Sequence, residues 1–271
     1  MKKFINGMKK FFDDIVKYKY YMVHAAKSEL KAEVANSYLN WVWWILEPLC
    51  FMFVYYIIFG VFFNSKKAYF TAFIFIGITM WDFFNRLVQG SVRSVKRNKS
   101  IVSKVYVPKY ILIIEKMFMN GFKMMIGFGI VAVLIICFRI KLTLNVLWFI
   151  PILFGLFTVT FGVSCFVLHY GVYVEDLSNI VSIVLRLMFY LTGIFYDIEE
   201  KVGKTDLASF GVYFNKVNPM ALLISSMRNV LLYGQAPHYK WIIAWFLGGI
   251  VVSVFGIRII QKNENSYVKV I

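Results

Sequence analysis

Residues 36–63 read NSYLNWVWWILEPLCFMFVYYIIFGVFF, and this stretch decides the fold class of the 271-residue chain. As a helix, its apolar part from Trp41 to Phe63 would be about 34 Å long, which is enough to cross the hydrocarbon core of a bilayer. A simple membrane anchor needs neither an acid nor a proline, yet this stretch contains Glu47 followed by Pro48. Because an ionisable residue inside a span is costly, Glu47 is a candidate functional residue.

The composition of the whole chain excludes an ordinary soluble domain. Hydrophobic residues make up 60% of it, aromatic residues make up 19%, and the mean hydropathy is +0.69. The net charge of +16 comes from basic residues that flank the apolar runs, which is typical of membrane topology signals rather than of nucleic-acid binding. The three cysteines and three histidines lie far apart, so we expect no disulfide framework and no metal site.

Five further apolar runs follow the first one, and each is long enough to be read as a span. They cover residues 69–88, 108–138, 146–170, 177–195 and 241–260. The sequence therefore predicts an all-α membrane protein with six transmembrane helices. Lysine and arginine number seventeen in residues 1–35, 91–110 and 258–271, against nine in the loops of the opposite side. This asymmetry predicts that both termini are cytosolic.

The sequence predicts three regions along the chain: an N-terminal helix, a membrane domain and a C-terminal tail. Residues 1–35 place apolar residues at helical spacing and eight lysines largely on the other face, which predicts an amphipathic helix that lies in the membrane interface. Docking of this helix on a partner protein is an alternative, and both can hold. Residues 36–260 would form the membrane domain, and residues 261–271 a polar cytosolic tail.

Residues 196–239 differ from the rest because their two apolar pieces, 207–214 and 220–233, are too short to span a membrane. Asn218 is a plausible N-cap with Pro219 at the first helical position, and Gly234 is a plausible stop. We expect two half-length helices that form an extracellular re-entrant hairpin before the last span, a structure that needs protein or water around it.

Few residues are candidates for catalysis, nucleotide binding or substrate binding. Gly203-Lys204-Thr205 resembles the end of a phosphate-binding loop, but position 198 is Ile where that loop needs glycine, so we interpret it as a chance match and expect no ATP site in this chain. Glu175-Asp176 could be a catalytic carboxylate pair, although an acidic helix start or a partner contact is the simpler interpretation. Arg186 and Arg228 lie within or beside apolar stretches, so each should face protein or water and could touch an anionic substrate.

Aromatic residues are frequent near the ends of the predicted spans. Interfacial belts and helix packing account for most such residues, and stacking on sugar rings is a second interpretation. The members of interest are Trp41, Trp43, Trp44, Tyr55, Tyr56, Phe195 and Tyr196.

A set of short motifs, weak singly but ordered along residues 30–260, resembles ABC-2-type permeases, and the branch that exports O-antigen, teichoic acid and capsular polysaccharides in particular. In the first span these motifs are Ser37-Tyr38-Leu39, Trp43-Trp44, Pro48-Leu49 and Phe59-Gly60. Further along they are Gly77, Trp81, Phe83-Phe84, Asn98, Lys104, Pro108, Asp176, Asn179, Gly193-Ile194-Phe195-Tyr196, Asn218-Pro219, Arg228 and Gly234. The chain departs from the family at Asn40, where glycine is usual, at Val34-Ala35-Asn36, which replaces a Tyr-Lys-Gly-like run, and at Glu175, where an arginine is common.

This resemblance implies a subunit of an ATP-driven exporter in a bacterial cytoplasmic membrane. Two copies of the chain would form the channel above two separate ATPase subunits, which would bind the ATP and magnesium, and the substrate would be a lipid-linked polysaccharide. Residues 91–104 would act as a coupling helix on the ATPase. The chain itself would bind no cofactor and no nucleic acid.

The resemblance and the positions along the spans together select two groups of candidate residues. The substrate path would include Trp43, Trp44, Glu47, Tyr55, Tyr56, Phe195, Tyr196 and Arg228. The contact with the ATPase would include Arg93, Lys96, Arg97, Lys99, Lys104, Glu175 and Asp176. Val92, Val95 and Val102 can form an apolar stripe among the basic residues of the coupling segment.

Three other functions stay open. An ABC-2 exporter of a drug or a small lipid would share all of these features. A membrane-embedded enzyme acting on lipid-linked sugars would use Glu175 and Asp176. A proton-coupled secondary transporter would centre on Glu47 and would need no ATPase.

Overall fold

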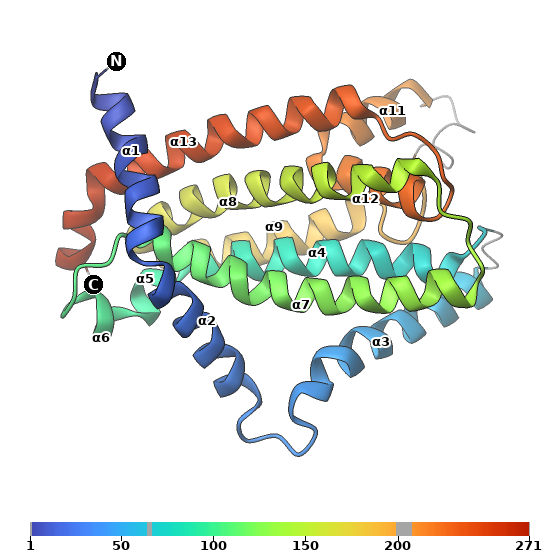
Figure 1. The fold of residues 1–271 in the computed structure, drawn as a ribbon, viewed down its shortest axis with the longest axis horizontal. Helices are drawn as coiled ribbons and strands as arrows, with labels where there is room; N and C mark the ends of the chain where they lie inside the picture. Colours follow the sequence, from blue (N-terminus) through green and yellow to red (C-terminus); the bar gives the residue numbers. More distant parts are fainter. Residues whose placement is uncertain (1, 64–66, 199–207, 271) are drawn as a thin grey trace.

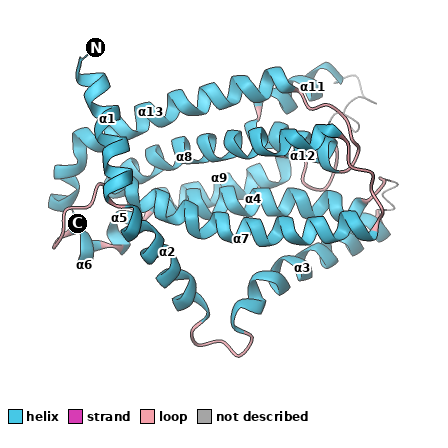
Figure 2. Ribbon diagram, in the orientation of Figure 1, coloured by secondary structure: helices cyan, strands magenta, loops and turns pink. Residues whose placement is uncertain are grey.

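The computed structural model describes residues 2–63, 67–198 and 208–270, and every regular element among them is a helix (Figure 2). The predicted all-α class is therefore confirmed. Five helical stretches are long and apolar enough to cross a membrane. They are Asn40–Phe62, Phe70–Val92, Lys109–Cys137, Leu144–Tyr173 and Tyr239–Tyr267. Gly203-Lys204-Thr205 lies outside the described residues.

The first span combines three helical geometries. It begins with the short helix η1 (Asn40–Val42), continues as α3 (Trp43–Tyr55) and ends in the wide π-type turns of η2 (Tyr56–Phe62). Asn40 has φ 48°, a left-handed conformation that glycine adopts freely and asparagine tolerates better than most residues. The left-handed backbone thus accounts for an asparagine where the resemblance predicts that glycine is usual.

Helix α4 (Phe70–Val92) is the buried centre of the bundle. Helices α7 (Lys109–Cys137) and α8 (Phe149–Tyr173) pack against it, and α8 continues the short helix η3 (Leu144–Trp148). Helix α13 (Tyr239–Val270) packs along α8, and Figure 1 shows α7, α4, α8 and α13 running side by side. Because α13 extends to Val270, most of the predicted polar tail is the end of a helix.

Small residues bring α8 and α13 into the most extensive helix contact of the chain. A Cβ atom on Gly249 would lie 2.8 Å from Thr158 Oγ1, and one on Gly256 would lie 2.5 Å from Cys165 Cβ. A Cβ on Gly162 of α8 would lie 2.9 Å from Val252 Cγ1. Close approach through small residues is how apolar helices gain packing energy where lipid provides no hydrophobic drive.

The N-terminal region is two helices rather than one, α1 (Lys2–Lys17) and α2 (Lys19–Val34), and α2 packs on α7. The end of α13 holds α1 in place. Lys10 Nζ lies 3.3 Å from Glu264 Oε1, and Tyr106 donates a hydrogen bond of 2.6 Å to the same oxygen. In Figure 1 both termini lie at the same end of the molecule as the segment after α4.

The predicted coupling segment forms two four-residue helices, α5 (Ser94–Arg97) and α6 (Lys99–Val102), instead of a single helix. Its valine stripe does not face outward, since Val92, Val95 and Val102 are all buried in the chain itself. These side chains dock the segment on the bundle. The basic residues of the segment stay exposed, together with Ile101, Val105 and Tyr106.

The predicted fifth span is shorter than expected. Helix α9 (Leu177–Leu191) has 15 residues, about 22 Å, and a left-handed turn at Gly193 follows it. Helices α11 (Ala208–Val217) and α12 (Pro219–Leu231) are the two half-length helices expected before the last span. The Asn218 side chain accepts hydrogen bonds from the Met220 and Ala221 amides, and Gly234 has φ 63°, so the predicted cap and stop are confirmed.

Adjacent glycines on α13 test the contact between α8 and α13. We expect Gly249→Ala to lower the thermal midpoint of the detergent-purified protein, because overpacking at such a position costs about 1–3 kcal/mol. Gly248→Ala is the matched control, since a Cβ there meets no atom within 4 Å. Equal midpoints for the two variants would contradict the close approach.

Candidate functional site

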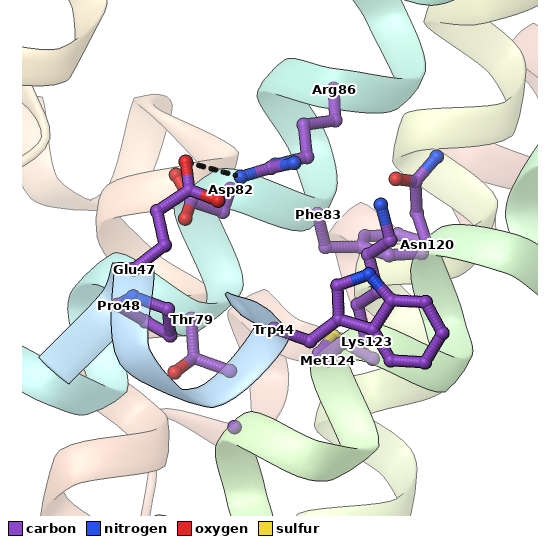
Figure 3. A pocket seen from close by; sticks show the side chains of 11 residues that line it. Trp44, Glu47, Pro48, Thr79, Asp82, Phe83, Arg86, Asn120, Lys123 and Met124 are labelled. Carbon is purple, nitrogen blue, oxygen red and sulfur yellow. Dashed lines mark hydrogen bonds and ion pairs between the residues drawn. The ribbon is translucent and has the colours of Figure 1, made fainter. Parts of the chain in front are cut away.

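Charged residues from three membrane helices, α3, α4 and α7, line a pocket near the start of the first span (Figure 3). Glu47 of α3 accepts a hydrogen bond of 3.1 Å from Nη2 of Arg86 on α4. Asp82 lies one helical turn before Arg86 and lines the same pocket. The side chains of Glu47 and Arg86 are 47% and 36% exposed, so this ion pair is not enclosed by the single chain.

The same pocket contains buried polar atoms that have no hydrogen-bond partner among the residues that the structure describes. They are Trp44 Nε1, Thr79 Oγ1 and Asn120 Oδ1, and the last two belong to residues that are less than 7% exposed. The pocket volume of about 50 Å³ provides room for roughly four water molecules. Since buried polar groups are nearly always hydrogen-bonded, these atoms are suited to water or to a hydroxyl-bearing ligand.

A larger cavity lies next to this pocket. It has a volume of about 760 Å³ and lies between α2, α4, α7 and the start of α9. Arg86, Asn120 and Lys123 line both spaces. Five of its fourteen lining residues are basic and two are acidic, so the cavity carries an excess of positive charge.

Sequence reasoning found Trp44 and Glu47 but missed Arg86 and Asp82. The sequence does indicate them as candidates, because Asp82 and Arg86 are two ionisable residues, four positions apart, within the apolar run 69–88. The argument that selected Glu47 applies to them equally. What the sequence does not contain is the pairing across helices, which joins Glu47 to a residue 39 positions later.

Two of the outer aromatic candidates, Tyr55 and Phe195, pack together with Phe59. The Phe195 ring lies 4.6 Å from the Tyr55 ring and stacks on Phe59 at 4.5 Å between centroids. Phe195 is only 5% exposed, so packing is its observed role and contact with a substrate stays a prediction. Tyr196 donates a hydrogen bond to the Tyr190 carbonyl, whereas Tyr56 is exposed. At the inner end of the span Trp43 is exposed and donates to Ser37 Oγ.

Arg228 holds the outer end of the bundle together. Its guanidinium donates to the carbonyl oxygens of Phe73, Gly193 and Ile194 at 2.9, 2.9 and 2.7 Å. It also lies on the Phe73 ring, 3.5 Å from the centroid. With 3% exposure, and only a cavity of about 10 Å³ beside it, the side chain has no room for a sugar. In the single chain these contacts make Arg228 a clamp between α4, α12 and the turn after α9, and its contact with a substrate stays a prediction.

The residues expected to contact the ATPase gather on one surface. Lys96 is half-buried, and the other six candidates are exposed: Arg93, Arg97, Lys99, Lys104, Glu175 and Asp176. Lys96 Nζ lies 3.0 Å from Glu175 Oε1, and this hydrogen bond and charge lower the pKa of Glu175 below its ordinary value. The pair therefore persists until the pH falls through that lowered pKa. Asp176 precedes α9, but its side chain makes no capping hydrogen bond.

The comparison with known proteins decides the family. Residues 22–232 match the family described as ABC-2 type transporter. The chain belongs to the ABC-2 transporter family. The resemblance predicted from the motifs is therefore confirmed, the chain is a multi-pass transmembrane subunit, and the ATPase of such a transporter is a separate partner.

Two bacterial permeases are similar to the chain over most of its length. An O-antigen export system permease protein RfbA of Klebsiella pneumoniae is 26% identical over 254 residues, which are 92% of this chain and 94% of that protein. A protein of the same name from Myxococcus xanthus is 22% identical over 258 residues, or 94% and 96% of the two chains. This ABC-2 chain is thus similar along almost its entire length to permeases named for O-antigen export.

A pair of variants tests the Arg228 clamp. We expect Arg228→Met to lower the thermal midpoint by several degrees, because three buried carbonyls would lose their donor at about 1–3 kcal/mol for each unsatisfied group. Arg186→Met removes the same charge from an exposed position on α9 and should leave the midpoint nearly unchanged. An unchanged midpoint for Arg228→Met would contradict the clamp.

Proposed function

We propose that this chain is the permease of an ABC exporter that moves a lipid-linked cell-surface polysaccharide of the O-antigen, teichoic acid or capsule type across the bacterial cytoplasmic membrane. The observation that carries the proposal is the full-length similarity to O-antigen export permeases. The polar pocket and basic cavity beside the first span support it, because a charged glycan needs a hydrated, cationic region at the membrane.

The proposed topology has six passes, with α9 as a short fifth pass and α11 and α12 as an outer re-entrant hairpin. Both termini would be cytosolic. Two observations support this arrangement. The termini lie at the same end as the basic segment 93–104 (Figure 1), and most of the lysines and arginines belong to that end. Helices α1 and α2 would lie in the inner interface.

The channel is proposed to form between two copies of this chain. In the single chain, η1, α3 and η2 have no buried residue, although they make up an apolar span. Helix α9 buries only Ser178 and Leu185. Two apolar helices with so little buried surface favour a second copy as the cover, with the substrate passing between them. Trp44, Glu47, Tyr55 and Tyr56 would lie on or near that path.

Coupling to ATP hydrolysis is proposed to run through the basic segment. Two ATPase subunits would bind below it, and their closure would move the segment and the membrane helices together. Because the Lys96–Glu175 pair joins the segment to the start of α9, a push on residues 93–104 would reach the helix proposed to line the channel.

Charge reversal tests this route. We expect Lys96→Glu/Arg97→Glu to abolish export at a normal protein level while the complex still hydrolyses ATP. Polysaccharide export in cells and ATP hydrolysis by the purified complex would measure the two effects. Normal export by this variant would contradict the coupling role.

A charge swap separates the two possible roles of Lys96. Lys96→Glu introduces a carboxylate next to Glu175, and Lys96→Glu/Glu175→Lys restores an ion pair of opposite polarity. Rescue of export by the swap would mean that the contact within the chain transmits the movement. If the swap stays inactive, Lys96 itself meets the ATPase.

Deletion of the gene tests the function. We expect the surface polysaccharide to disappear and lipid-linked glycan to accumulate inside the cell, and both to recover when the wild-type gene is restored. The chain should also co-purify with an ATPase subunit. An unchanged cell surface, together with loss of drug or lipid efflux, would overturn the proposal in favour of a small-molecule exporter.

A further inference from the structure

An apolar groove lies between helix α1 and the membrane helices α7, α8 and α13. Its volume is about 360 Å³. Helix α1 contributes Met8, Phe11 and Phe12 to its walls, and the residues from α13 run from Ile250 to Ile257, a length of about 10 Å along that helix. No described residue of α3, η2 or α9 lines it, so the groove is separate from the helices proposed to line the channel.

The groove offers no free polar group to a ligand. Its two hydroxyl groups already donate to backbone carbonyl oxygens, Thr158 Oγ1 to Phe154 at 3.0 Å and Ser253 Oγ to Thr158 at 3.1 Å. The other lining side chains are aliphatic, aromatic or thioether groups. A ligand that fills this space must therefore be hydrocarbon where it contacts the protein.

The groove extends from helix α1 to the level of the hydrocarbon core. Its α7 residues, Ile114 and Met117, lie in the first third of the span Lys109–Cys137. Its α8 and α13 residues lie near the middle of the spans Leu144–Tyr173 and Tyr239–Tyr267. In a multi-pass membrane protein, an apolar groove at this depth is filled by hydrocarbon rather than by water.

Helix α1 closes the inner end of the groove. It crosses the membrane helices near the end that carries both termini (Figure 1). The Phe11 ring lies 5.2 Å from the Tyr110 ring and 6.1 Å from the Phe161 ring, so this residue anchors α1 on the bundle. Phe12 also lines the groove but is 60% exposed, which leaves the groove open on that side.

The lysines of α1 favour an anionic ligand. At about 100° per residue, Lys9 lies about 60° from Phe12 around the helix, on the groove side, whereas Lys10 lies on the other side and pairs with Glu264. Lys9 is exposed and makes no ion pair in the described part of the chain, not even with Asp13 four residues later. A free lysine beside an apolar groove at the membrane interface attracts an anionic lipid head group.

The size of the groove excludes a whole partner helix. A helix is about 10–12 Å wide with its side chains, so about 800–1,200 Å³ would be needed to hold one over the same length of about 10 Å. The groove provides less than half of that volume. A single acyl chain is only one methylene wide, and it suits a narrow space of this kind.

We propose that this groove binds one acyl chain of an anionic phospholipid, and that the phosphate of the lipid contacts Lys9. The ligand is a resident lipid of the membrane rather than the exported molecule. By filling the space under α1, it holds this helix against the bundle. Tyr18, which follows α1, donates a hydrogen bond of 3.0 Å to the Tyr106 carbonyl just after the basic segment, so a fixed α1 also steadies that segment.

Photolabelling of the complex of this chain with its ATPase, in phosphatidylcholine nanodiscs, tests the groove. The probe is phosphatidylglycerol with a diazirine on one acyl chain, and mass spectrometry locates the labels. We expect labelled residues on the groove walls, and we expect Val254→Trp, which fills the groove from α13, to lower this labelling severalfold. Val251→Trp is the matched control, since it adds the same side chain at an exposed α13 position outside the groove and should be labelled as the wild type is.

A second variant guards against misfolding of the first. Met117→Trp fills the same groove from α7 and should lower the labelling in the same way. Labelling of the groove walls at the wild-type level in either folded tryptophan variant would overturn the site.

The phosphate contact has its own test. Lys9→Gln should lower labelling by the phosphatidylglycerol probe severalfold and leave labelling by a phosphatidylcholine probe with the same acyl chain unchanged. Lys31→Gln removes an exposed lysine from α2, away from the groove, and should change neither. Equal labelling of Lys9→Gln and the wild type, or an equal loss with both probes, would overturn the contact.

Competitors identify the lipid. Unlabelled phosphatidylglycerol should displace the probe at lower concentration than added phosphatidylcholine or an isoprenyl diphosphate. Equal displacement by phosphatidylcholine would overturn the preference for an anionic lipid. Stronger displacement by the isoprenyl diphosphate would overturn the proposal in favour of a site for a substrate's lipid. None of these outcomes depends on which molecule the transporter exports.

Discussion

Charged side chains within apolar helices must find partners in the protein or keep access to water, because an unpaired charge in hydrocarbon is too costly. Most of what distinguishes this structure from a simple bundle follows from that constraint. Arg228 satisfies it with three backbone carbonyls and an aromatic ring, and so ties α12 to α4 and to the turn after α9. Glu47 and Arg86 satisfy it with each other, and both side chains stay partly exposed in the single chain.

Arg228 and the Glu47–Arg86 pair differ in how much space surrounds them. The fully buried Arg228 is a rigid part of the outer half, where the small adjoining cavity admits no more than about one water. The partly exposed Glu47–Arg86 pair lies where the polar pocket meets the basic cavity, so the polar cavities gather around this pair and away from Arg228. An exporter that takes up a charged, lipid-linked substrate near the inner leaflet would need this asymmetry.

Several features could be read from single residues. Asn218, Pro219 and Gly234 predicted the start and stop of α12, since helix capping depends on local backbone chemistry. The length of apolar runs predicted most spans for the same kind of reason. The valine stripe near residue 95 was misjudged, because periodicity indicates an apolar face but not whether the chain itself or a partner covers it.

The sequence by itself determined that this chain lives in a membrane, is all-helical and belongs among the ABC-2 transporters, because span length, charge asymmetry and ordered motifs are local properties. Only the tertiary structure decided that Glu47 meets Arg86, that Lys96 meets Glu175 and that Arg228 clamps carbonyls. Each of these pairs joins residues tens of positions apart, and their meeting depends on which helix faces pack together. The close approach of α8 and α13 through glycines fixes one such pair of faces, and no local pattern specifies it.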